Sequence, residues 1–469
     1  MDIEHVLTNG NCHQCGVCVG VCPTDAIEIY QDSKKGLYPR FIRPLCTDCD
    51  LCYLTCPGEN LDWFDVKYFT FNENDGNGQI KEYPEIGYYK EIYSGYAKDE
   101  ALRIEGASGG IATHLLTYLL ETGRIDGAVV CRMDKERPLE PDVFMAHTRE
   151  ELIEAQQSKY IPVPTGVILK EILKTDGRFA VVGLPCHVHG IRQAQQRMPR
   201  IRKRIVLQIG LFCGFHPSFT STKFLARRAG VKDFDQIKEI RYRDKTWPGG
   251  FNVIKKDGTD NILHPVEEFL WAHKVFERGR CATCTDGYAE FSDISLGDEW
   301  RHDQLVREDY KKGWSSIITH TDVGEKLIQE LREKNILYIE KCEPEVVRAA
   351  QMPKKEFAWA TIRIRKFLGL AIPNYHYVDD KVKVRPKMYL ASLVVMLVAG
   401  FMEIEIVNRL LTNIPRFFFL KYQGLLFKLM YYKRAQKFSK SSRLFLIVSL
   451  TISILLFIFT IIILMKLFG

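Results

Sequence analysis

The chain lacks the basic and then apolar stretch of a secretory signal peptide at its N-terminus, so we expect its first part to stay in the cytoplasm. It also lacks a strong compositional bias. Hydrophobic residues make up 46% and charged residues 26% of the sequence, which gives no reason to expect a large disordered part. With 469 residues the chain is too long for one core, and a prior of ~150 residues per domain predicts about three domains.

Acidic residues are missing from one long segment near the C-terminus. Every charged residue between Arg409 and Arg443 is basic, and these residues alternate with phenylalanine and leucine. Because an apolar run follows directly, the net charge of +7 indicates a membrane surface rather than a nucleic acid as the partner. We therefore expect residues 380–443 to form a basic, amphipathic, interfacial membrane segment, and we expect no nucleic-acid partner.

Charge of either sign is missing from Leu444 to Met465. A helix over this range would be about 33 Å long, which is enough to cross the hydrocarbon core of a bilayer. The sequence therefore predicts a transmembrane helix at 444–465, with the basic run before it on the cytoplasmic side. This predicts a membrane localisation with the lipid bilayer as a partner, a single pass near the C-terminus, and a cytoplasmic catalytic part. The shorter uncharged run from Met388 to Met402 is expected to lie in the interface or to re-enter, and a second span there stays open.

Cysteine, in contrast, is abundant. Eight of the fourteen cysteines form two runs with the spacing Cys-x-x-Cys-x-x-Cys-x-x-x-Cys-Pro, which is the known spacing of bacterial two-cluster ferredoxins. In that fold the last cysteine of each run ligates the other [4Fe-4S] cluster. The first cysteine set is therefore Cys12, Cys15, Cys18 and Cys56, and the second cysteine set is Cys46, Cys49, Cys52 and Cys22.

Structural zinc and disulfides are the alternatives for these runs. Zinc ribbons use paired Cys-x-x-Cys knuckles and have no use for the third cysteine or for the Cys-Pro that follows. Disulfides between cysteines so close together would be strained, and a cytosolic compartment would keep them reduced. We interpret residues 1–65 as a ferredoxin module. Residues 66–90 are expected to be a linker because Asn72 to Gln79 is polar and glycine-rich, and this predicts modules that are joined rather than interwoven.

Apolar runs alternate with helical periods from about Tyr93 onward. Strands are expected at Gly127–Cys131, Phe179–Gly183, Ile205–Cys213 and Ser292–Asp298, with a hairpin formed by Glu239–Arg243 and Phe251–Ile254. Helices are expected after Gly110 and from Val323 to Glu333. Residues 91–365 therefore form an α/β domain with a mainly parallel or mixed sheet. The predicted fold class is a multidomain α+β and α/β protein, made of the ferredoxin module, this α/β domain and a C-terminal transmembrane helix.

Six short stretches of this region occur together in one known family. They are Gly106–Gly110 (GASGG), Gln157–Tyr160 (QSKY), Val182–Cys186 (VGLPC), Gly210–Cys213 (GLFC), Cys281–Cys284 (CATC) and Asp293–Asp298 (DISLGD). Through them the chain resembles the beta-subunit family of coenzyme F420 hydrogenases and dehydrogenases, which are iron-sulfur flavoproteins. The resemblance covers about residues 90 to 365, and members of the family often carry a ferredoxin module at the N-terminus.

The resemblance implies that this domain binds FAD and exchanges two electrons with the deazaflavin coenzyme. Ser108, Gly109 and Gly110 could present backbone amides to a pyrophosphate at a helix start, and Lys159 and Tyr160 could contact the flavin or an acidic coenzyme tail. On the residues alone, an ordinary helix entry, a solvated lysine and a core-edge tyrosine are the alternatives. No catalytic acid or base is named, because the chemistry does not obviously require one.

Four further cysteines are candidates for a third [4Fe-4S] cluster, because the family carries one in this domain. Cys186 and Cys213 follow predicted buried strands, where functional groups of open α/β sheets collect, and Cys281 and Cys284 form a doublet. We call these four the third cysteine set. Free cysteines, buried at the first two positions and exposed at the doublet, are the alternative. Cys131 and Cys342 are expected to be packing residues.

The leading functional prediction is a membrane-anchored oxidoreductase. FAD would exchange two electrons with a hydride carrier such as reduced coenzyme F420, and single electrons would pass along the clusters to ferredoxin or to other redox partner subunits. One alternative is a reductase of an organic ring substrate, since relatives of the family include a reductase acting on a chlorophyll side group. Another is a non-catalytic electron-transfer subunit that docks a membrane complex.

Overall fold

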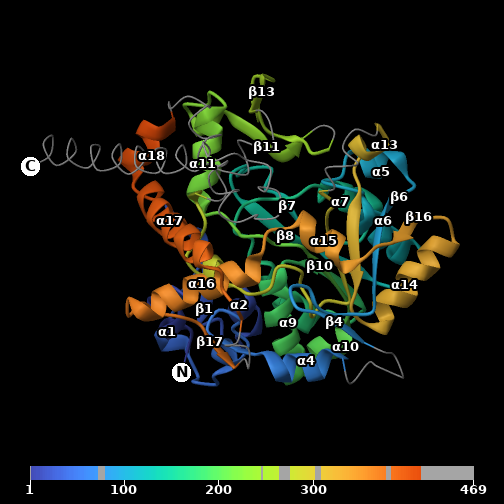
Figure 1. The fold of residues 1–469 in the computed structure, drawn as a ribbon, viewed down its shortest axis with the longest axis horizontal. Helices are drawn as coiled ribbons and strands as arrows, with labels where there is room; N and C mark the ends of the chain where they lie inside the picture. The colour runs from blue at the N-terminus through green and yellow to red at the C-terminus, as the bar shows by residue number, and fades with distance from the viewer. Residues whose placement is uncertain are drawn as a thin grey trace, which may run out of the picture.

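The computed structural model describes residues 2–71, 80–244, 247–263, 275–300, 308–376 and 382–412. The predicted transmembrane helix at 444–465 and residues 413–443 of the predicted basic segment lie outside the described residues. Figure 1 shows a central sheet with helices on both sides and the N-terminal module packed beside the C-terminal helices.

The centre of the molecule is a mixed eight-stranded sheet with the strand order β16-β6-β15-β14-β10-β9-β7-β8. Strands β14, β10, β9 and β7 are parallel neighbours, whereas β15 and β8 are antiparallel to the strands beside them. The mixed sheet confirms the predicted α/β class. The strands are β6 (Glu91–Ala97), β7 (Gly127–Met133), β8 (Pro141–Ala146), β9 (Phe179–Gly183), β10 (Ile205–Leu211), β14 (Ile294–Asp298), β15 (Ser315–Thr319) and β16 (Leu337–Lys341).

Helices cover both faces of this sheet because its central strands are apolar on both sides. Ala128 packs in the core under α6 (Ile111–Glu121) and α14 (Asp322–Glu333). The next residue, Val129, packs in the opposite core, under α8 (Leu169–Lys174), α9 (Pro185–Arg197) and α10 (Pro199–Arg204). Shorter helices lie around this body: α5 (Glu100–Ile104), α7 (Arg149–Glu154) and α13 (Glu308–Lys311).

The N-terminal module has a ferredoxin-like arrangement of short elements. They are α1 (Ile3–Thr8), α2 (Val17–Val21), β1 (Ile27–Asp32), β2 (Gly36–Phe41), α3 (Leu51–Leu54), β3 (Asn60–Asp62) and α4 (Trp63–Phe71). Helices α2 and α3 each end shortly before a Cys-Pro pair.

This module is interwoven with the α/β body, so the expectation of modules that are merely joined is wrong. Val17 and Val21 of α2 belong to the same buried core as α8 and α9. A Cβ atom on Gly20 would lie 2.0 Å from the carbonyl oxygen of Gly166 in the 3-10 turn η2 (Thr165–Ile168), so the two backbones are in direct contact. Sequence periodicity cannot reveal such a contact, because it depends on the absence of a side chain at one position.

The predicted linker at 66–90 also proves to be largely structured. It contains most of α4, together with β4 (Lys81–Tyr83) and β5 (Gly87–Tyr89), which pair as a hairpin. Val66 and Phe71 are buried against Phe291 in a shared core. Only residues 72–79 of this range lie outside the described residues. The polar stretch therefore indicated a linker much shorter than 66–90, because apolar residues before it, such as Val66 and Phe71, are buried.

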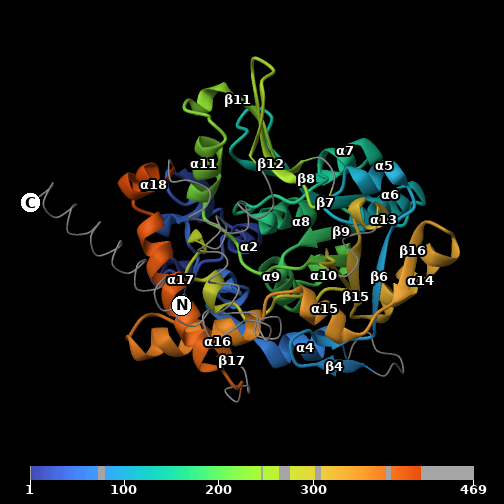
Figure 2. The same ribbon diagram turned by 45° about the horizontal axis from the view of Figure 1, so that its top comes forward.

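The remaining elements extend the body toward the C-terminus. A three-stranded sheet consists of β11 (Ile237–Asp244), β12 (Gly250–Lys255) and β13 (Asp260–Leu263). Its first two strands form the predicted hairpin, and the sheet packs with α11 (Phe219–Arg228). The last elements are α15 (Pro344–Ala350), α16 (Lys354–Phe367), β17 (Asn374–His376), α17 (Pro386–Met402) and α18 (Glu405–Thr412). Strand β17 pairs in parallel with β3, which brings the C-terminal part back to the N-terminal module, and Figure 2 shows the same proximity from a second side.

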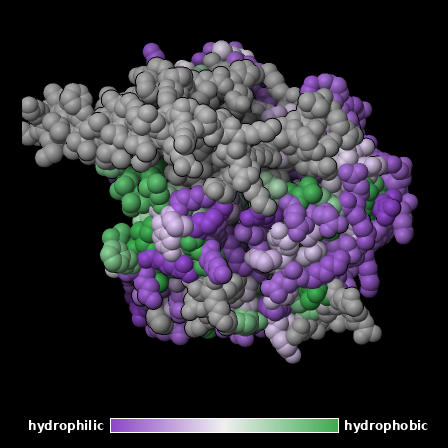
Figure 3. All heavy atoms as spheres, in the orientation of Figure 1, coloured by the Kyte–Doolittle hydropathy of each residue, from purple (hydrophilic) through white to green (hydrophobic). Residues whose placement is uncertain are grey.

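The structure corrects the predicted membrane localisation. In the described ranges, no helix has both the length and the apolar character that a bilayer crossing requires. The run from Met388 to Met402 forms α17, which buries Met388, Ala391 and Val395 in a core shared with α16. Its other side carries exposed leucines, which contribute to the apolar surface beside α16 in Figure 3. Hydropathy alone could not show that α16 supplies a partner for one side of this helix.

Candidate functional site

The second cysteine set lies together near the surface of the N-terminal module. Cys46, Cys49 and Cys52 line one cavity with Cys22 of the other run. Cys49 is exposed, whereas Cys52 is buried. Three acidic residues share this lining, namely Asp2, Asp48 and Asp50. The structure therefore brings together the four residues that sequence spacing assigned to one group.

The first cysteine set is buried deeper in the module. Burial, with a contribution from the nearby Cys12, raises the pKa of the Cys15 thiol to about 12. Burial likewise raises the pKa of Cys56, with Cys15 and Cys12 as the next contributors. Burial raises the pKa of Cys18 as well, and Cys15, Cys12 and Cys56 are the next contributors, so the four thiols of this set lie close together. Because metal ligation requires thiolates, a bound cationic core would release their protons.

The third cysteine set also converges. Cys186 lies in the first turn of α9 and Cys213 follows β10, while Cys281 begins the short turn η4 (Cys281–Thr283) and Cys284 ends it. All four line one cavity. Burial raises the pKa of Cys186 well above its usual value, and Cys15 of the first set is the next largest contributor. The third set therefore lies next to the first.

None of the fourteen cysteines, all of which lie in the described ranges, forms a disulfide. In the part of the chain that the structure describes, no three His, Cys, Asp or Glu side chains converge on one point as they would around a single ion. The second and third sets instead surround volumes, which suits a group of several atoms. Cys131 and Cys342 line neither cavity.

Cationic side chains that the sequence analysis did not single out surround the third set. Arg278 lines its cavity and donates a hydrogen bond from Nη2 to the Cys12 carbonyl at 2.9 Å. Arg280 donates to the carbonyls of Gly58 at 2.7 Å and Pro57 at 3.0 Å, both just after Cys56. These arginines hold the loop of the third set against the first set. Their position before the Cys-x-x-Cys doublet was the one available sequence signal.

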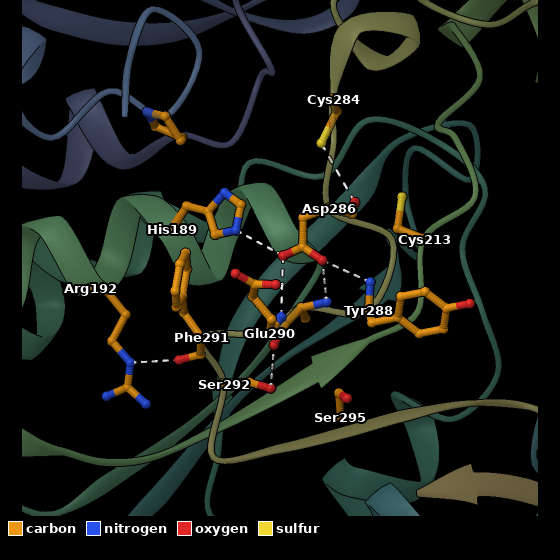
Figure 4. Close-up of polar contacts among 12 residues, drawn as sticks. His189, Arg192, Cys213, Cys284, Asp286, Tyr288, Glu290, Phe291, Ser292 and Ser295 are labelled. Atoms are coloured by element: carbon orange, nitrogen blue, oxygen red, sulfur yellow. Dashed lines mark hydrogen bonds and ion pairs between the residues drawn. The ribbon is translucent and has the colours of Figure 1, made fainter. Parts of the chain in front are cut away.

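A buried network fixes the backbone on the other side of Cys284 (Figure 4). Asp286 accepts hydrogen bonds from the amides of Tyr288 at 2.8 Å and Ala289 at 2.9 Å, and its carboxylate lies 2.8 Å from His189 Nε2. Burial alone would raise the pKa of Asp286, but these contacts hold it below its usual value. Because His189 lies on α9 just after Cys186, the network ties two ligand-bearing segments together.

The glycine-rich turn before α6 is shaped by contacts within the protein. The Gly109 amide donates to Ser315 Oγ at 2.9 Å, and the Ser108 hydroxyl lies 2.5 Å from the same oxygen. A Cβ on Gly110 would lie 2.6 Å from the Leu102 carbonyl, and Gly110 has a φ of 72°. Close backbone packing and a left-handed conformation therefore explain the glycines. The Gly109 amide is not available to a pyrophosphate in this arrangement.

Lys159 and Tyr160 are also occupied by protein groups. Lys159 Nζ donates to three carbonyls at the end of α7, including Ala155 at 2.7 Å, and burial lowers its pKa to about 8. The Tyr160 hydroxyl lies 3.1 Å from Arg243 Nη1, which also pairs with Asp298 at 2.8 Å. Arg243 further binds the Ala107 carbonyl at 2.9 Å. Arg243 thus joins three of the six stretches through which the chain resembles the family, at the carboxyl edge of the sheet. The sequence analysis did not identify this residue.

Comparisons with known proteins agree with this geometry. Two family models describe the N-terminal and the C-terminal parts of the coenzyme F420 hydrogenase/dehydrogenase beta subunit, and they match residues 92–170 and 176–345 respectively. Residues 11–60 match the 4Fe-4S dicluster domain.

The chain is similar to individual members as well. It is 31% identical to the beta subunit of the coenzyme F420 hydrogenase of Methanothermobacter thermautotrophicus, over 61% of this chain and 99% of that protein. It is 27% identical to the F subunit of the F(420)H(2) dehydrogenase of Methanosarcina mazei, over 71% of this chain and 85% of that protein. Its fold is similar to a chain of the F420-reducing [NiFe] hydrogenase complex from Methanosarcina barkeri, with a TM-score of 0.50, 25% identity, and coverage of 62% of this chain and 97% of that one.

Proposed function

Because the chain belongs to the coenzyme F420 hydrogenase/dehydrogenase beta-subunit family and is an iron-sulfur oxidoreductase, we propose that it exchanges two electrons with coenzyme F420 through FAD. We further propose that it passes single electrons along three [4Fe-4S] clusters. Residues 1–65 would carry two clusters, and residues 91–365 would carry FAD and the third. Because the relatives are named as subunits of F420 hydrogenases and dehydrogenases, we propose that this chain also works beside partner subunits.

The observation that carries the proposal is the convergence of the third cysteine set beside the first. Cys186, Cys213, Cys281 and Cys284 come from three separate segments and line one cavity, and Cys186 lies close enough to Cys15 for their thiols to interact. Four thiol ligands around a cavity match the donor set of a [4Fe-4S] cluster. Neighbouring clusters are what a chain of one-electron transfers needs, because each cluster accepts a single electron.

The residues of the chain would fix this arrangement rather than move during turnover. Arg278 and Arg280 join the loops of the first and third sets through carbonyl contacts. The buried pair of His189 and Asp286 holds α9 against the segment after Cys284. We therefore propose that the order of clusters runs from the exposed second set through the first set to the third set.

FAD is proposed on family membership, and its contacts with the five residues named from the sequence stay a prediction. A bound flavin supplies the step that splits a hydride pair into single electrons. Ser108, Gly109, Gly110, Lys159 and Tyr160 make contacts within the protein, and we propose that they shape the site around Arg243. The carboxyl edge of the sheet, where Arg243 and Asp298 meet, is where ligands of open α/β sheets bind.

Metal and flavin analysis of anaerobically purified protein tests the proposal. Three clusters require about twelve iron and twelve sulfide per chain, together with one FAD that bleaches when reduced coenzyme F420 is added. Cys281→Ser should remove close to a third of the iron, whereas Cys342→Ser, at a half-buried cysteine outside the three sets, should remove none. About eight iron in the fully reconstituted parent would overturn the third cluster, and the absence of flavin would overturn FAD.

A further inference from the structure

A buried lysine forms part of the wall around the third cysteine set. Lys354 is the first residue of α16, only 5% of its surface is exposed, and it lines the same cavity as the four cysteines. Its Nζ donates a hydrogen bond to the Cys213 carbonyl at 2.8 Å and lies 3.8 Å from Cys213 Sγ. The ammonium group is therefore aimed at a cysteine of the set.

The charge on Lys354 has no carboxylate in direct contact among the described residues. Its two hydrogen bonds both go to Cys213. The carboxyl groups of Glu277 and Asp286 are near enough to interact electrostatically. A buried ammonium is costly unless it is paired, and here the groups that offset its cost are the sulfurs of the third set.

We propose that Lys354 is a positioning residue that raises the reduction potential of the cluster held by Cys186, Cys213, Cys281 and Cys284. This inference rests on the proposed third cluster. One-electron reduction adds one negative charge to a buried group and makes or breaks no bond. A fixed positive charge and a hydrogen bond at a ligand sulfur both favour the reduced form, and both are recognised determinants of cluster potential.

The neighbouring lysine, Lys355, offers a matched control for substitutions of Lys354. Lys354→Met removes the charge and keeps the length of the side chain, and Lys354→Arg keeps the charge. Lys355→Met makes the same change one position later. Lys355 lines neither cysteine cavity, and its Nζ donates a hydrogen bond to the Pro84 carbonyl. Each protein is purified anaerobically as the full chain, its iron is counted, and its clusters are titrated against potential with spectroscopic detection of each reduced cluster.

We expect Lys354→Met to lower the potential of one cluster so that its reduced-to-oxidised ratio at a fixed potential falls at least tenfold, a shift of about 59 mV. The other two clusters, Lys354→Arg and Lys355→Met should stay near the parent values. An unchanged potential in Lys354→Met with about twelve iron would overturn the role of Lys354 and leave the third cluster intact. Loss of about four iron in Lys354→Met would mean that the lysine holds the cluster, which also overturns the proposal. A parent with about eight iron would overturn the proposed function itself.

Discussion

At Gly20 the lack of a side chain allows the ferredoxin module to dock. Its Cα faces the carbonyl of Gly166, and across the same contact a Cβ on Gly166 would lie 2.4 Å from the Val17 amide nitrogen. Two glycines therefore meet backbone to backbone between modules that are far apart in the sequence. An added methyl group on either one would force the helices apart, because nearby backbone atoms cannot move as flexible side chains can.

We expect Gly20→Ala to destabilise the protein by about 2 kcal/mol or more. Gly400 is also helical, but no described atom lies within 4 Å of a Cβ placed there. Gly400→Ala should therefore be neutral or should stabilise α17 by up to about 1 kcal/mol. Urea unfolding of both variants measures the difference, and equal effects at the two glycines would contradict the proposed contact.

Buried histidines make stability depend on pH. Burial lowers the pKa of His320 to about 4, where its ring lies between the Tyr88 carbonyl and the Ser295 hydroxyl. In the unfolded chain a histidine has a pKa near ~6.5. As the pH falls from about 6.5 toward 4 the unfolded state takes up the proton first, so stability is lost on acidification and is fully present above this window.

We expect His320→Gln to weaken this pH dependence by up to one proton, or about 1.4 kcal/mol per pH unit, between about pH 5 and 6.5. The free energy of unfolding is measured in urea at several pH values under anaerobic conditions. His147→Gln, at an exposed ring, controls for the substitution itself. A slope in His320→Gln equal to that of the parent would show that His320 does not contribute.

At the scale of elements, sequence periodicity predicted helices and strands correctly where apolar residues recur at regular spacing and are buried. The strand predicted at Phe179–Gly183 is β9, and the helix predicted from Val323 to Glu333 is α14 within one residue. Cysteine spacing also predicted the grouping of Cys22 with the second run. Arg243 and Lys354 were not predictable, because a charged residue shows no periodic signal and gains its meaning from partners distant in the sequence.

Helix α17 gives a prediction at this scale, because its two sides have different surroundings. Val395 is 1% exposed in the core with α16, whereas Leu397 is 52% exposed. We expect Val395→Asp to destabilise the protein by about 3 kcal/mol or more, since it would bury an unpaired carboxylate. Leu397→Asp should change the thermal midpoint little. Similar midpoints for the two variants would contradict the packing of α17 on α16.

For the whole molecule, the important fact is that the N-terminal module shares its cores with the rest of the chain. Trp63 and Phe71 pack on Phe291, Val17 packs with the helices under the sheet, and Arg280 binds carbonyls next to Cys56. Removing the module would expose these surfaces and take away two carbonyl acceptors of the buried Arg280. The α/β body is therefore not expected to fold well without it.

A chain that begins at residue 80 should give little soluble, cooperatively folding protein. Replacing the eight ferredoxin cysteines by serine instead leaves the backbone contacts in place, and this variant should stay soluble and lose about eight iron. Soluble yield and thermal unfolding compare the two. A stable, flavin-binding protein from residue 80 onward would show that the modules are separable after all.

The pairing of β17 with β3 has a consequence for how the protein is made. Residues 60–62 leave the ribosome early, but their partner strand is synthesised about 300 residues later. At about 5–20 residues per second, the first module waits roughly 15 to 60 seconds for the segment that completes it. During that interval the ferredoxin cysteines belong to an unfinished nascent chain. Cofactor insertion therefore has a period before β17 pairs with β3 and completes the module.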